Sequence, residues 1–458
     1  MNYYLAIDIG ASSGRHILGC VRDGRLCLEE IYRFENGYVE KNGHFYWDIN
    51  KLFESVCAGI KRCAELGKIP VSLSIDTWGV DYALLDENDC LIDGMIAYRD
   101  PRTENIPSKV YSIIPKRELF TRVGIAENTF NTIFQLYCDK ESGKLERAES
   151  MLFVPCYLNY LLTGNKLNEY TFASTTGLLN VESRDWDRDV CERLGYPEKL
   201  FTRLGQPGEL VGMLDERLAG FSCKVYLCAS HDTASAVAAV PAKDSPLFIS
   251  SGTWSLIGIE SDRPSTDEFS ESQKFTNEGG VCGTVRFLQN IMGLWMIQSV
   301  KRELGNKYGY AELMELAKAS SYEGVVKVND PRFLAPDNMC RAIRDQLSEN
   351  GYAAPESTGD LLRAVYFGLA HAYADAADGI ERITDRKFDT IHIVGGGSRD
   401  EYLNTLTANI ARRKVVTGIT EATAIGNLAV QLIAEGEVDG LAQARQLIAR
   451  SFDLNEKI

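Results

Sequence analysis

A histidine and an aspartate lie side by side in CASHDTASAVAAV, residues 228–240, at the start of an alanine-rich run. Serine, histidine and aspartate in direct succession do not form a hydrolase triad, because triads are assembled from distant positions. The run predicts a helix with Asp232 as its N-cap, where the helix dipole favours an ionised carboxylate. Such a carboxylate is also what a phosphoryl transferase uses to orient a hydroxyl and accept its proton. The stretch alone leaves both interpretations open.

Two glycine- and serine-rich turns offer groups that bind phosphate. In DIGASSGR, residues 8–15, small residues let backbone N–H groups approach phosphate oxygens, while two serine hydroxyls and Arg15 add donors and a cation. Asp8, at the end of an apolar strand, has the oxygen chemistry to hold the Mg²⁺ that accompanies a nucleotide. SSGTWS, residues 250–255, is a similar turn. Each turn alone is typical of a tight hairpin, whereas the pair favours a clamp on a triphosphate.

Further glycines occur where a ligand could approach the backbone. GGGSRDEY, residues 395–402, follows a predicted strand and suits either adenine or phosphate binding or close helix–strand packing. Ser398 and Glu401 there predict a capping box for the following helix. In DTWGVD, residues 76–81, Gly79 would let a small polyol approach, although a tryptophan in this setting is more often part of the core.

The elements around these motifs predict an α/β protein. Apolar runs separated by turns predict three strands over residues 3–34, and helical spacing of apolar residues predicts a helix over residues 48–66. VSLSIDTWG reads as a buried strand, and YALLDENDCLIDGMIAY as a hairpin that turns at residues 86–89. LFISSGTWSLIGIES repeats the strand–turn–strand plan of the N-terminus, which suggests a weak internal repeat with one copy opening each half. We place the domain boundary near Val240–Pro241.

Composition excludes several classes of protein. A chain of 458 residues exceeds the usual size of a single core, so two or more domains are expected. The formal net charge of −15 makes nucleic acid and anionic membranes poor partners. Twelve cysteines without a CxxC pair indicate reduced thiols, and five scattered histidines do not support a zinc site. With no basic, apolar signal segment at its start, the chain is expected to be cytoplasmic.

The motifs together resemble those of the FGGY carbohydrate kinases, relatives of actin and hexokinase in fold. The residues that resemble the family, in the family's order along the whole chain, are DIGASSGR, DTWGVDYALL, YRDPRT, ASHDTASAV, SSGTWSLIG, FLQNIMGLW, HIVGGGSRDEYLN and EATAIGNLAVQ. The resemblance implies two actin-like (ribonuclease H-like) domains, residues 1–241 and 242–458, each a mixed β-sheet flanked by helices, with a cleft between them. It implies ATP as co-substrate, Mg²⁺ as cofactor, a small-molecule sugar as partner, and a monomer or small homo-oligomer.

The resemblance also implies roles for individual residues. Asp232 matches the family's catalytic base, and Asp8 is the expected partner of Mg²⁺ through water. The residues that match ATP contacts are Ala11, Ser12, Ser13, Gly14, Arg15, Thr253, Gln298 and Gly396. The residues that match sugar contacts are Gly79, His231, Asp232, Thr233 and Asn290.

The implied reaction is in-line transfer of the γ-phosphoryl group of MgATP to the C1 hydroxyl of a ketose, L-rhamnulose. A kinase for another ketose, such as fuculose or xylulose, stays open, since a few hydroxyl contacts choose the substrate. An actin-like nucleotide switch is a second alternative, which would need neither an acceptor base nor a sugar.

Overall fold

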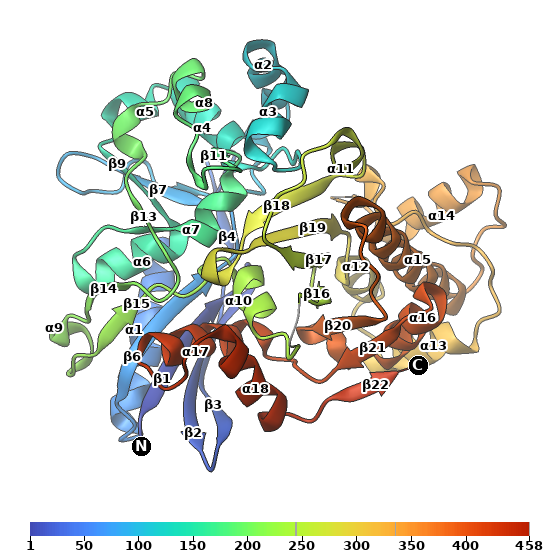
Figure 1. Ribbon diagram of the computed structural model, residues 1–458. Helices are drawn as coiled ribbons and strands as arrows, with labels where there is room; N and C mark the ends of the chain where they lie inside the picture. Colours follow the sequence, from blue (N-terminus) through green and yellow to red (C-terminus); the bar gives the residue numbers. More distant parts are fainter. Residues whose placement is uncertain (243–244, 335, 458) are drawn as a thin grey trace. The chain divides into compact units, whose positions relative to one another are not determined.

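The computed structural model describes residues 1–242, 245–334 and 336–457. The chain divides into two compact units. The first consists of Met1–Lys243, Glu260–Phe287 and Ala422–Ser451, and the second of Asp244–Ile259, Leu288–Glu421 and Phe452–Ile458. Figure 1 labels their helices and strands.

A six-stranded mixed sheet forms the centre of the first unit, in the order β14-β15-β6-β1-β2-β3. Strands β1, β2 and β3 form an antiparallel meander, as predicted, and β6 runs parallel to β1. The apolar residues of β1 are buried on both faces of the sheet, which is why it reads as an unbroken hydrophobic run. The strands are Tyr3–Ile9 (β1), Ser13–Arg22 (β2), Arg25–Glu35 (β3), Pro70–Thr77 (β6), Leu210–Met213 (β14) and Lys224–Tyr226 (β15).

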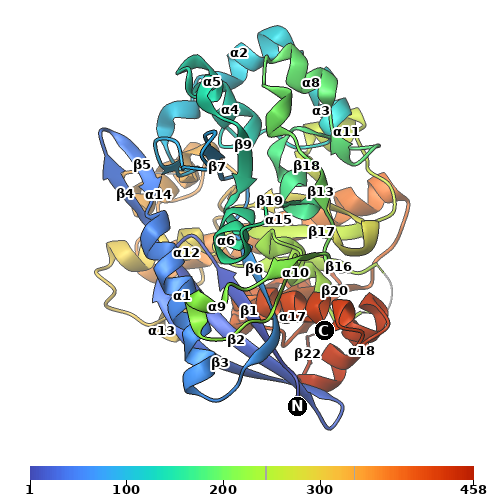
Figure 2. The ribbon, with the colours of Figure 1, turned by 90° about the vertical axis from the view of Figure 1, so that its left-hand side faces the viewer.

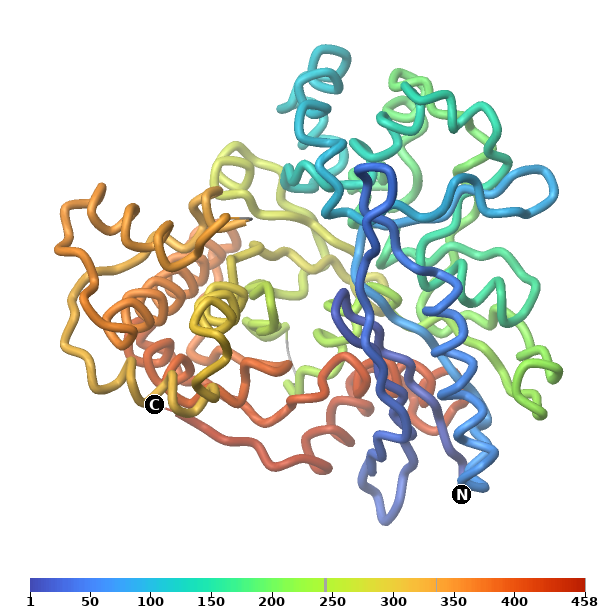
Figure 3. The backbone as a smooth tube through the Cα atoms, turned by 180° about the vertical axis from the view of Figure 1, so that it is seen from behind, coloured from blue at the N-terminus to red at the C-terminus, as the bar shows by residue number. Residues whose placement is uncertain are grey.

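Helices cover both faces of this sheet. Helix α1 (Ile49–Glu65) begins after Asp48, whose side chain accepts a hydrogen bond from Lys51 N (3.1 Å), and buries the apolar stripe that the sequence predicts. Figures 2 and 3 both show α1 running alongside the β2–β3 hairpin. Helix α17 (Ala422–Ala434) packs on the other side, where Leu428 lies against Gly19. Gly19 therefore leaves room for the helix above it.

Short strands and helices complete the first unit. The predicted hairpin that turns at residues 86–89 is present, since Asp86 N donates to Cys90 O (3.0 Å) and Leu85 pairs antiparallel with Leu91. The longer ladder of β7 is with β9. The strands are Tyr38–Lys41 (β4), His44–Trp47 (β5), Tyr82–Leu85 (β7), Met95–Ile96 (β8), Ser150–Phe153 (β9), Asn168–Glu169 (β10), Leu179–Asn180 (β11), Asp185–Trp186 (β12) and Leu204–Gly205 (β13). The helices are Ile106–Ile113 (α2), Lys116–Val123 (α3), Thr132–Glu141 (α4), Lys144–Arg147 (α5), Val154–Thr163 (α6), Tyr170–Ala173 (α7), Arg188–Arg193 (α8), Glu216–Ala219 (α9), Asp232–Ala238 (α10), Glu268–Ser272 (α11) and Leu441–Ser451 (α18).

A second mixed sheet has the order β18-β19-β17-β16-β20-β21-β22. Strands β16 and β17 form the predicted antiparallel hairpin, and β20 runs parallel to β16. The strands are Leu247–Ser251 (β16), Ser255–Ser261 (β17), Phe275–Gly279 (β18), Val285–Ile291 (β19), Thr390–Val394 (β20), Lys414–Thr417 (β21) and Asn455–Lys457 (β22). The helices of the second unit are Trp295–Glu303 (α12), Tyr310–Ala319 (α13), Met339–Glu349 (α14), Thr358–Thr384 (α15) and Glu401–Ala411 (α16).

The predicted capping box of α16 is wrong. Asp400 is the N-cap, and its side chain accepts from Leu403 N, whereas the Ser398 hydroxyl donates to Gly395 O (2.7 Å). Residues Gly396–Arg399 form a 3₁₀ turn between β20 and α16, so the serine lies one turn too early to reach the amides of the helix. Within the described part of the chain, no helix is both long enough and apolar enough to cross a membrane.

Candidate active site

Two aspartates occupy equivalent positions on neighbouring strands of the first sheet. Asp8 of β1 and Asp76 of β6 are direct partners in the parallel ladder. The next residue along β6, Thr77, bridges to His231, which places Asp232 at the same end of these strands. Burial, together with the charges of Asp8 and Asp232, raises the pKa of Asp76 well above its ordinary value. The fold therefore gathers three carboxylates from three distant segments.

Asp8 lies opposite Arg15 across the β1–β2 hairpin. Arg15 donates to Asp8 Oδ2 from Nε (2.9 Å) and from a terminal nitrogen (2.7 Å). The loop between them has a close turn, in which Gly10 N donates to Ser13 O (2.9 Å). Asp8 and Arg15, which are both predicted site residues, thus contact each other. The Asp8 carboxylate holds the Arg15 guanidinium beside the loop that we expect to bind phosphate.

The predicted loop Ala11–Arg15 contains one glycine that packing explains. A Cβ on Gly14 would lie 2.2 Å from the ring of Phe34, so only glycine fits beneath that ring. Ser12 is exposed, and Ala11 and Ser13 are half-buried. The backbone of the loop tip is therefore accessible, as a phosphate-binding loop requires.

Asp76 is a site residue that sequence reasoning missed. It is fully buried, and its Oδ2 accepts from Asn427 Nδ2 of α17 (2.6 Å). Within the described residues its Oδ1 has no hydrogen-bond partner. The signal was an Ile–Asp pair at the end of an apolar strand, which VSLSIDT shares with LAIDIG. Asn427 lies in EATAIGNLAVQ, a stretch in which no site residue was predicted.

His231, rather than Asp232, is the N-cap of α10, so the predicted cap was off by one residue. His231 has an extended backbone (φ −79°, ψ 119°) because it still pairs with Thr77 as a strand residue. Asp232 is the first residue of the helix. Its Oδ1 accepts from Thr233 N (2.5 Å) and Thr233 Oγ1 (3.1 Å). The local turn thus fixes one carboxylate oxygen.

The other oxygen of Asp232 is available for a ligand. No donor among the described residues contacts Oδ2, and the Asp232 side chain is 32% exposed, whereas that of His231 is 11% exposed. Desolvation raises the pKa of Asp232, an effect that His231 opposes and Asp8 reinforces. The carboxylate is therefore oriented, accessible and more basic than an ordinary aspartate.

The side chain of His231 has two charged neighbours that sequence reasoning also missed. Arg286 of β19 contacts His231 Nδ1 through a terminal nitrogen (3.2 Å), and Glu278 Oε2 of β18 lies 3.4 Å from the same atom. On the other side of the ring, His231 Nε2 lies 3.4 Å from Asp232 Oδ1. The available signal for Arg286 was a charged residue between the apolar residues of VRFLQN, whereas FTNEGG is polar and gave no comparable signal for Glu278.

Gly79 lies against the imidazole. A Cβ at this position would be 3.4 Å from His231 Nε2 and 3.4 Å from Thr175 Oγ1, so a side chain would fill the space beside the ring. The next residue, Val80, has φ +68°, which is rare for a β-branched residue. Thr132 Oγ1 donates to Val80 O (2.6 Å) and holds this conformation. A strained segment fixed by side chains is a common feature of ligand-binding sites.

Trp78 belongs to the core, as its residue type favours. It is buried, its ring centroid lies 4.1 Å from that of Trp47, and its Nε1 donates to Asp81 Oδ2 (2.8 Å). Trp47 Nε1 donates to the same oxygen (2.7 Å). Burial raises the pKa of Asp81 to about 6, against the effect of these hydrogen bonds. Asp81 therefore fixes the rings on which the Gly79 segment rests.

The remaining predicted residues lie in the second unit. Thr253 is at the exposed turn of the β16–β17 hairpin, and its carbonyl accepts from Trp295 N (3.1 Å) at the start of α12. Gln298 follows on the same helix, half-buried, and Asn290 is half-buried near the end of β19.

Gly396 and its neighbours follow β20, at the same end of the parallel β16–β20 pair as the β16–β17 turn. A Cβ on Gly397 would be 1.9 Å from Ser251 Oγ, so this glycine permits close packing. Gly395 has φ +85°, a conformation that favours glycine. Around Gly396 itself there is no atom within 4 Å of a Cβ position in the described part of the chain, and the residue is exposed. Gly396 thus has room for a ligand, while its neighbours serve the fold.

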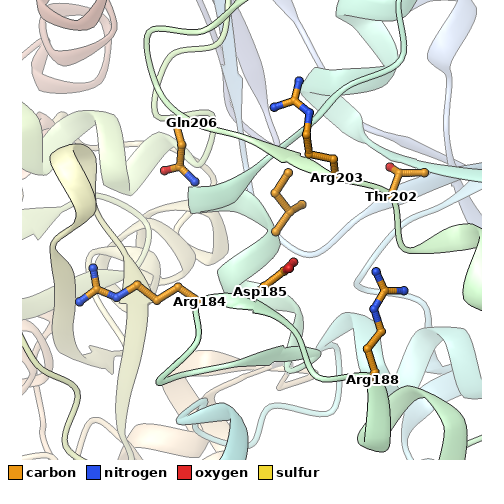
Figure 4. Close-up of a pocket in the computed structure, with 7 residues that line it drawn as sticks. Arg184, Asp185, Arg188, Thr202, Arg203 and Gln206 are labelled. Atoms are coloured by element: carbon orange, nitrogen blue, oxygen red, sulfur yellow. The ribbon is translucent and has the colours of Figure 1, made fainter.

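A polar pocket of about 490 Å³ lies elsewhere in the first unit, and Figure 4 shows the side chains that line it. None of the predicted site residues is among them. Arg203 pairs with Glu209 (2.6 Å), and Arg188 donates to Phe201 O (3.0 Å). Because its arginines are engaged by the protein, this pocket does not compete with the three-carboxylate cluster as the candidate site.

Two domain models of one protein family match the chain. The model of the FGGY family of carbohydrate kinases, N-terminal domain, matches residues 3–238, and the model of its C-terminal domain matches residues 247–435. Among curated proteins, the chain is 46% identical to a rhamnulokinase of Halalkalibacterium halodurans over 100% of this chain and 99% of that protein. It is 45% identical to a rhamnulokinase of Oceanobacillus iheyensis, over 98% of this chain and 97% of that protein.

Solved structures show the same fold at low identity. A gluconate kinase from Lactobacillus acidophilus superposes with a TM-score of 0.82 at 17% identity, over 100% of this chain and 93% of that one. A glycerol kinase from Plasmodium falciparum, solved with ADP, gives a TM-score of 0.79 at 13% identity, over 100% and 94% of the two chains. These structures confirm the predicted α/β fold of two domains.

Proposed function

The chain belongs to the FGGY family of carbohydrate kinases, and from that membership we propose that it transfers the γ-phosphoryl group of ATP to the C1 hydroxyl of L-rhamnulose. The observation that supports this substrate is near full-length identity of 45–46% to two rhamnulokinases. The location that we propose is the cytoplasm, where ATP is available; all twelve cysteines of the chain are free thiols. We also propose a monomer or small homo-oligomer.

Asp232 acts as the base in this proposal. Its Oδ1 is held by Thr233, which leaves Oδ2 to accept a hydrogen bond from the C1 hydroxyl. A loose phosphoryl-transfer transition state needs little base strength, so the proton moves to the carboxylate late in the reaction. The raised pKa of Asp232 makes it a better acceptor than an ordinary aspartate at the moment of transfer.

The sugar contacts that we propose are Gly79, His231, Thr233 and Asn290. His231 Nε2 and the backbone of Gly79 are near one another, since a Cβ on Gly79 would lie 3.4 Å from that nitrogen. A ketose hydroxyl in this space would meet a ring nitrogen and backbone without a side chain in its way. Thr175, whose hydroxyl borders the same space, is a further proposed contact.

The nucleotide contacts that we propose are Ala11, Ser12, Ser13, Gly14, Arg15, Thr253, Gln298 and Gly396. Exposed backbone at the first loop suits phosphate oxygens, and the open space at Gly396 suits a flat base. We propose two functional domains, residues 1–241 and 242–458. Their bounds are close to those of the two family matches, residues 3–238 and 247–435.

The donor set of the site fits Mg²⁺. Asp8 and Asp76 offer the oxygen ligands that this ion prefers, and Asp76 Oδ1 has no partner in the described part of the chain. No group of three or more described His, Cys, Asp or Glu side chains is arranged to hold a metal by itself. Asp8 and Asp76 would therefore hold an ion that takes its other ligands from phosphate and water. Bound Mg²⁺ would offset the charge of the phosphates.

The experiment is coupled release of ADP, measured over a panel of ketoses that includes L-rhamnulose, L-fuculose and D-xylulose. We expect the highest kcat/KM with L-rhamnulose. A higher value with another ketose would keep the family and change the substrate. ADP release that no sugar stimulates would overturn the kinase assignment and favour a nucleotide switch.

A further inference from the structure

Arg286 of β19 is a buried arginine that has no role in the proposed function. The Arg286 side chain is 0% exposed, and burial of a guanidinium is unfavourable unless it is paired and hydrogen-bonded. Arg286 Nε donates to Gly279 O (2.7 Å), and a terminal nitrogen lies 3.0 Å from Glu278 Oε2. Burial raises the pKa of Glu278, but its neighbours outweigh burial and lower it, the charge of the Arg286 guanidinium first among them. Arg286 and Glu278 therefore form an ion pair inside the protein, in which Glu278 Oε2 and the other terminal nitrogen of Arg286 have no hydrogen-bond partner among the described residues.

The third contact of Arg286 decides where the proton of His231 lies. Arginine only donates hydrogen bonds, and its terminal nitrogen lies 3.2 Å from His231 Nδ1 with hydrogen-bond geometry. Nδ1 must then be the acceptor, which means that a neutral ring carries its proton on Nε2.

If Glu278 were the hydrogen-bond partner of His231 instead, Nδ1 would carry the proton and donate to the Glu278 carboxylate. That contact is longer, at 3.4 Å, and Arg286 already compensates the charge of Glu278 at 3.0 Å. A protonated imidazolium would also place a second cation 3.2 Å from the guanidinium. The geometry favours the neutral ring with Nδ1 as acceptor.

The Nε2 side of the ring faces the proposed reaction site. Nε2 lies 3.4 Å from Asp232 Oδ1 and 3.4 Å from the Cβ position of Gly79. Glu169 also approaches the segment of His231, because its Oε2 accepts from Ser230 N (3.1 Å). An N–H at Nε2 can donate to Asp232 before substrate binds and to a sugar hydroxyl afterwards.

We propose that Arg286, neutralised by Glu278, is a positioning residue that locks His231 in the neutral Nε2–H tautomer, so that His231 donates toward Asp232 and the bound sugar. Arg286 does not touch the reacting atoms and acts only through His231. The sugar-binding part of this inference rests on the proposed function, whereas the tautomer does not.

The direct test is nitrogen NMR of the sugar-free protein labelled with ¹⁵N-histidine. The chain has five histidines, and a His231→Asn variant assigns the signal of interest. His16 provides an internal reference: its Nε2 lies 3.1 Å from Val56 O, which can only accept, and burial lowers its pKa to about 4. We expect His231 to show the same Nε2–H pattern as His16 from pH 6 to 8. An Nδ1–H pattern, or a cationic ring, would overturn the inference.

Variants add a functional test. Arg286→Met leaves Glu278 as the neighbour of Nδ1, so we expect the ring to change to Nδ1–H or to the cation. The kcat/KM for the ketose should fall about tenfold to a hundredfold, the loss typical of a hydrogen bond to a charged group, while KM for ATP changes little. Arg286→Lys, which keeps a cationic donor, should recover part of the loss. Equal losses in both variants with an unchanged His231 spectrum would contradict the role of Arg286.

A matched control is a second buried Arg–Glu pair among the described residues of the first unit. Arg445 lies 2.6 Å from Glu260 and donates to Val237 O (2.9 Å), but it does not contact His231. Arg445→Met should reduce stability and leave the His231 tautomer unchanged. If Arg286→Met does not fold, the wild-type spectrum and that of Glu278→Gln, in which Arg286 still faces Nδ1, decide the question. The His231 tautomer can be confirmed by NMR even in a protein that shows no ketose-dependent activity. A wrong tautomer and a wrong proposed function therefore give different experimental results.

Discussion

Asp232 is fixed by the residue that follows it. Thr233 uses its amide and its hydroxyl to hold Oδ1, so the carboxylate keeps one orientation at the first position of α10. The helix dipole favours the ionised form there, while desolvation raises the pKa of the group. These two effects act on the carboxylate in opposite directions.

Replacement of Asp232 by asparagine keeps the shape of the side chain and removes its ability to accept a proton. We expect kcat to fall by about 10²- to 10⁴-fold, the usual contribution of general base catalysis, with nucleotide binding and thermal stability preserved. Steady-state kinetics, nucleotide titration and thermal unfolding measure these three quantities. Turnover close to that of the wild type would contradict the assignment of the base.

The pH profile of the wild type provides an independent check on Asp232. Because only the carboxylate accepts a proton, kcat/KM should decrease as pH falls through the raised pKa of this group. The acid limb should therefore lie above the ordinary aspartate value of 3.8. An acid limb at or below that value would show that another group controls the profile.

Asp76 contributes to the site at the expense of stability. Its folded pKa is raised well above 3.8 by burial and by Asp8, so its contribution to stability is present below pH 3.8 and is lost as pH rises. Asp76→Asn removes the cost of ionising this buried carboxyl group, and the amide oxygen of the new side chain can still accept from Asn427. We expect a higher melting temperature at pH 7, a smaller gain near pH 4, and reduced kcat. Calorimetry at both pH values measures the gain; a lower melting temperature at pH 7 would contradict it.

At the scale of elements, local patterns were predictable and pairings between distant segments were not. The two hairpins and α1 follow from turn residues and apolar spacing that a short window contains. The ladder between β7 and β9 joins residues about seventy positions apart, and no local pattern specifies it. Arg286 and Glu278 were missed for the same reason, since the role of a charged residue in a buried strand depends on the partner that the fold brings to it.

Errors at helix starts have a different cause. The start of α10 was misplaced by one residue because strand pairing with Thr77 extends to His231. The start of α16 was misassigned because the glycine-rich turn before it is a 3₁₀ turn, which brings Asp400 rather than Ser398 to the cap. In each case several neighbouring residues are of types that commonly cap a helix, and the tertiary structure determines which of them is the N-cap.

The packing of α10 against α17 depends on a single glycine. A Cβ on Gly426 would lie 1.7 Å from Ser235 O, which is backbone and cannot move without the helix. Since α10 begins with Asp232, a shift of this helix also displaces the proposed base.

We expect Gly426→Ala to lower the free energy of unfolding by about 1–3 kcal/mol, the usual effect of overpacking, and to lower kcat. Urea unfolding and steady-state kinetics measure both effects. Gly37→Ala is the control, because no atom lies within 4 Å of its Cβ position in the described part of the chain. Equal stability of the two variants would contradict close packing of the helices.

At the scale of the whole molecule, buried carboxylates set how stability varies with pH. Glu169 is fully buried and accepts from Thr171 N (2.7 Å), Phe172 N (3.0 Å) and Ser230 N (3.1 Å). It thereby joins α7 to the segment that carries His231. Burial raises its pKa from 4.5 to about 7, although these hydrogen bonds oppose the shift.

The sign of the pH effect follows from this raised pKa. The contribution of Glu169 to stability is fully present below pH 4.5 and is lost as pH rises to about 7. A shift of this size corresponds to about 3 kcal/mol. Glu169→Gln cannot titrate, and it carries a constant penalty because an amide cannot accept all of these hydrogen bonds. The stability difference between wild type and variant should therefore shrink by about 3 kcal/mol from pH 4.5 to pH 7.

Urea unfolding at pH 4.5, 5.5 and 7, followed by tryptophan fluorescence, measures that difference. Glu381→Gln is a matched control: Glu381 is also buried, but Lys387, the amide of Phe388 and Arg413 outweigh its burial and lower its pKa to about 2. Its contribution to stability is lost only as pH falls toward 2, so the difference between wild type and this variant should be constant from pH 4.5 to 7. A constant difference for Glu169→Gln as well would mean that Glu169 is ionised throughout. In that case the carboxylate would hold the His231 segment through charge-assisted hydrogen bonds at every pH at which the protein is folded.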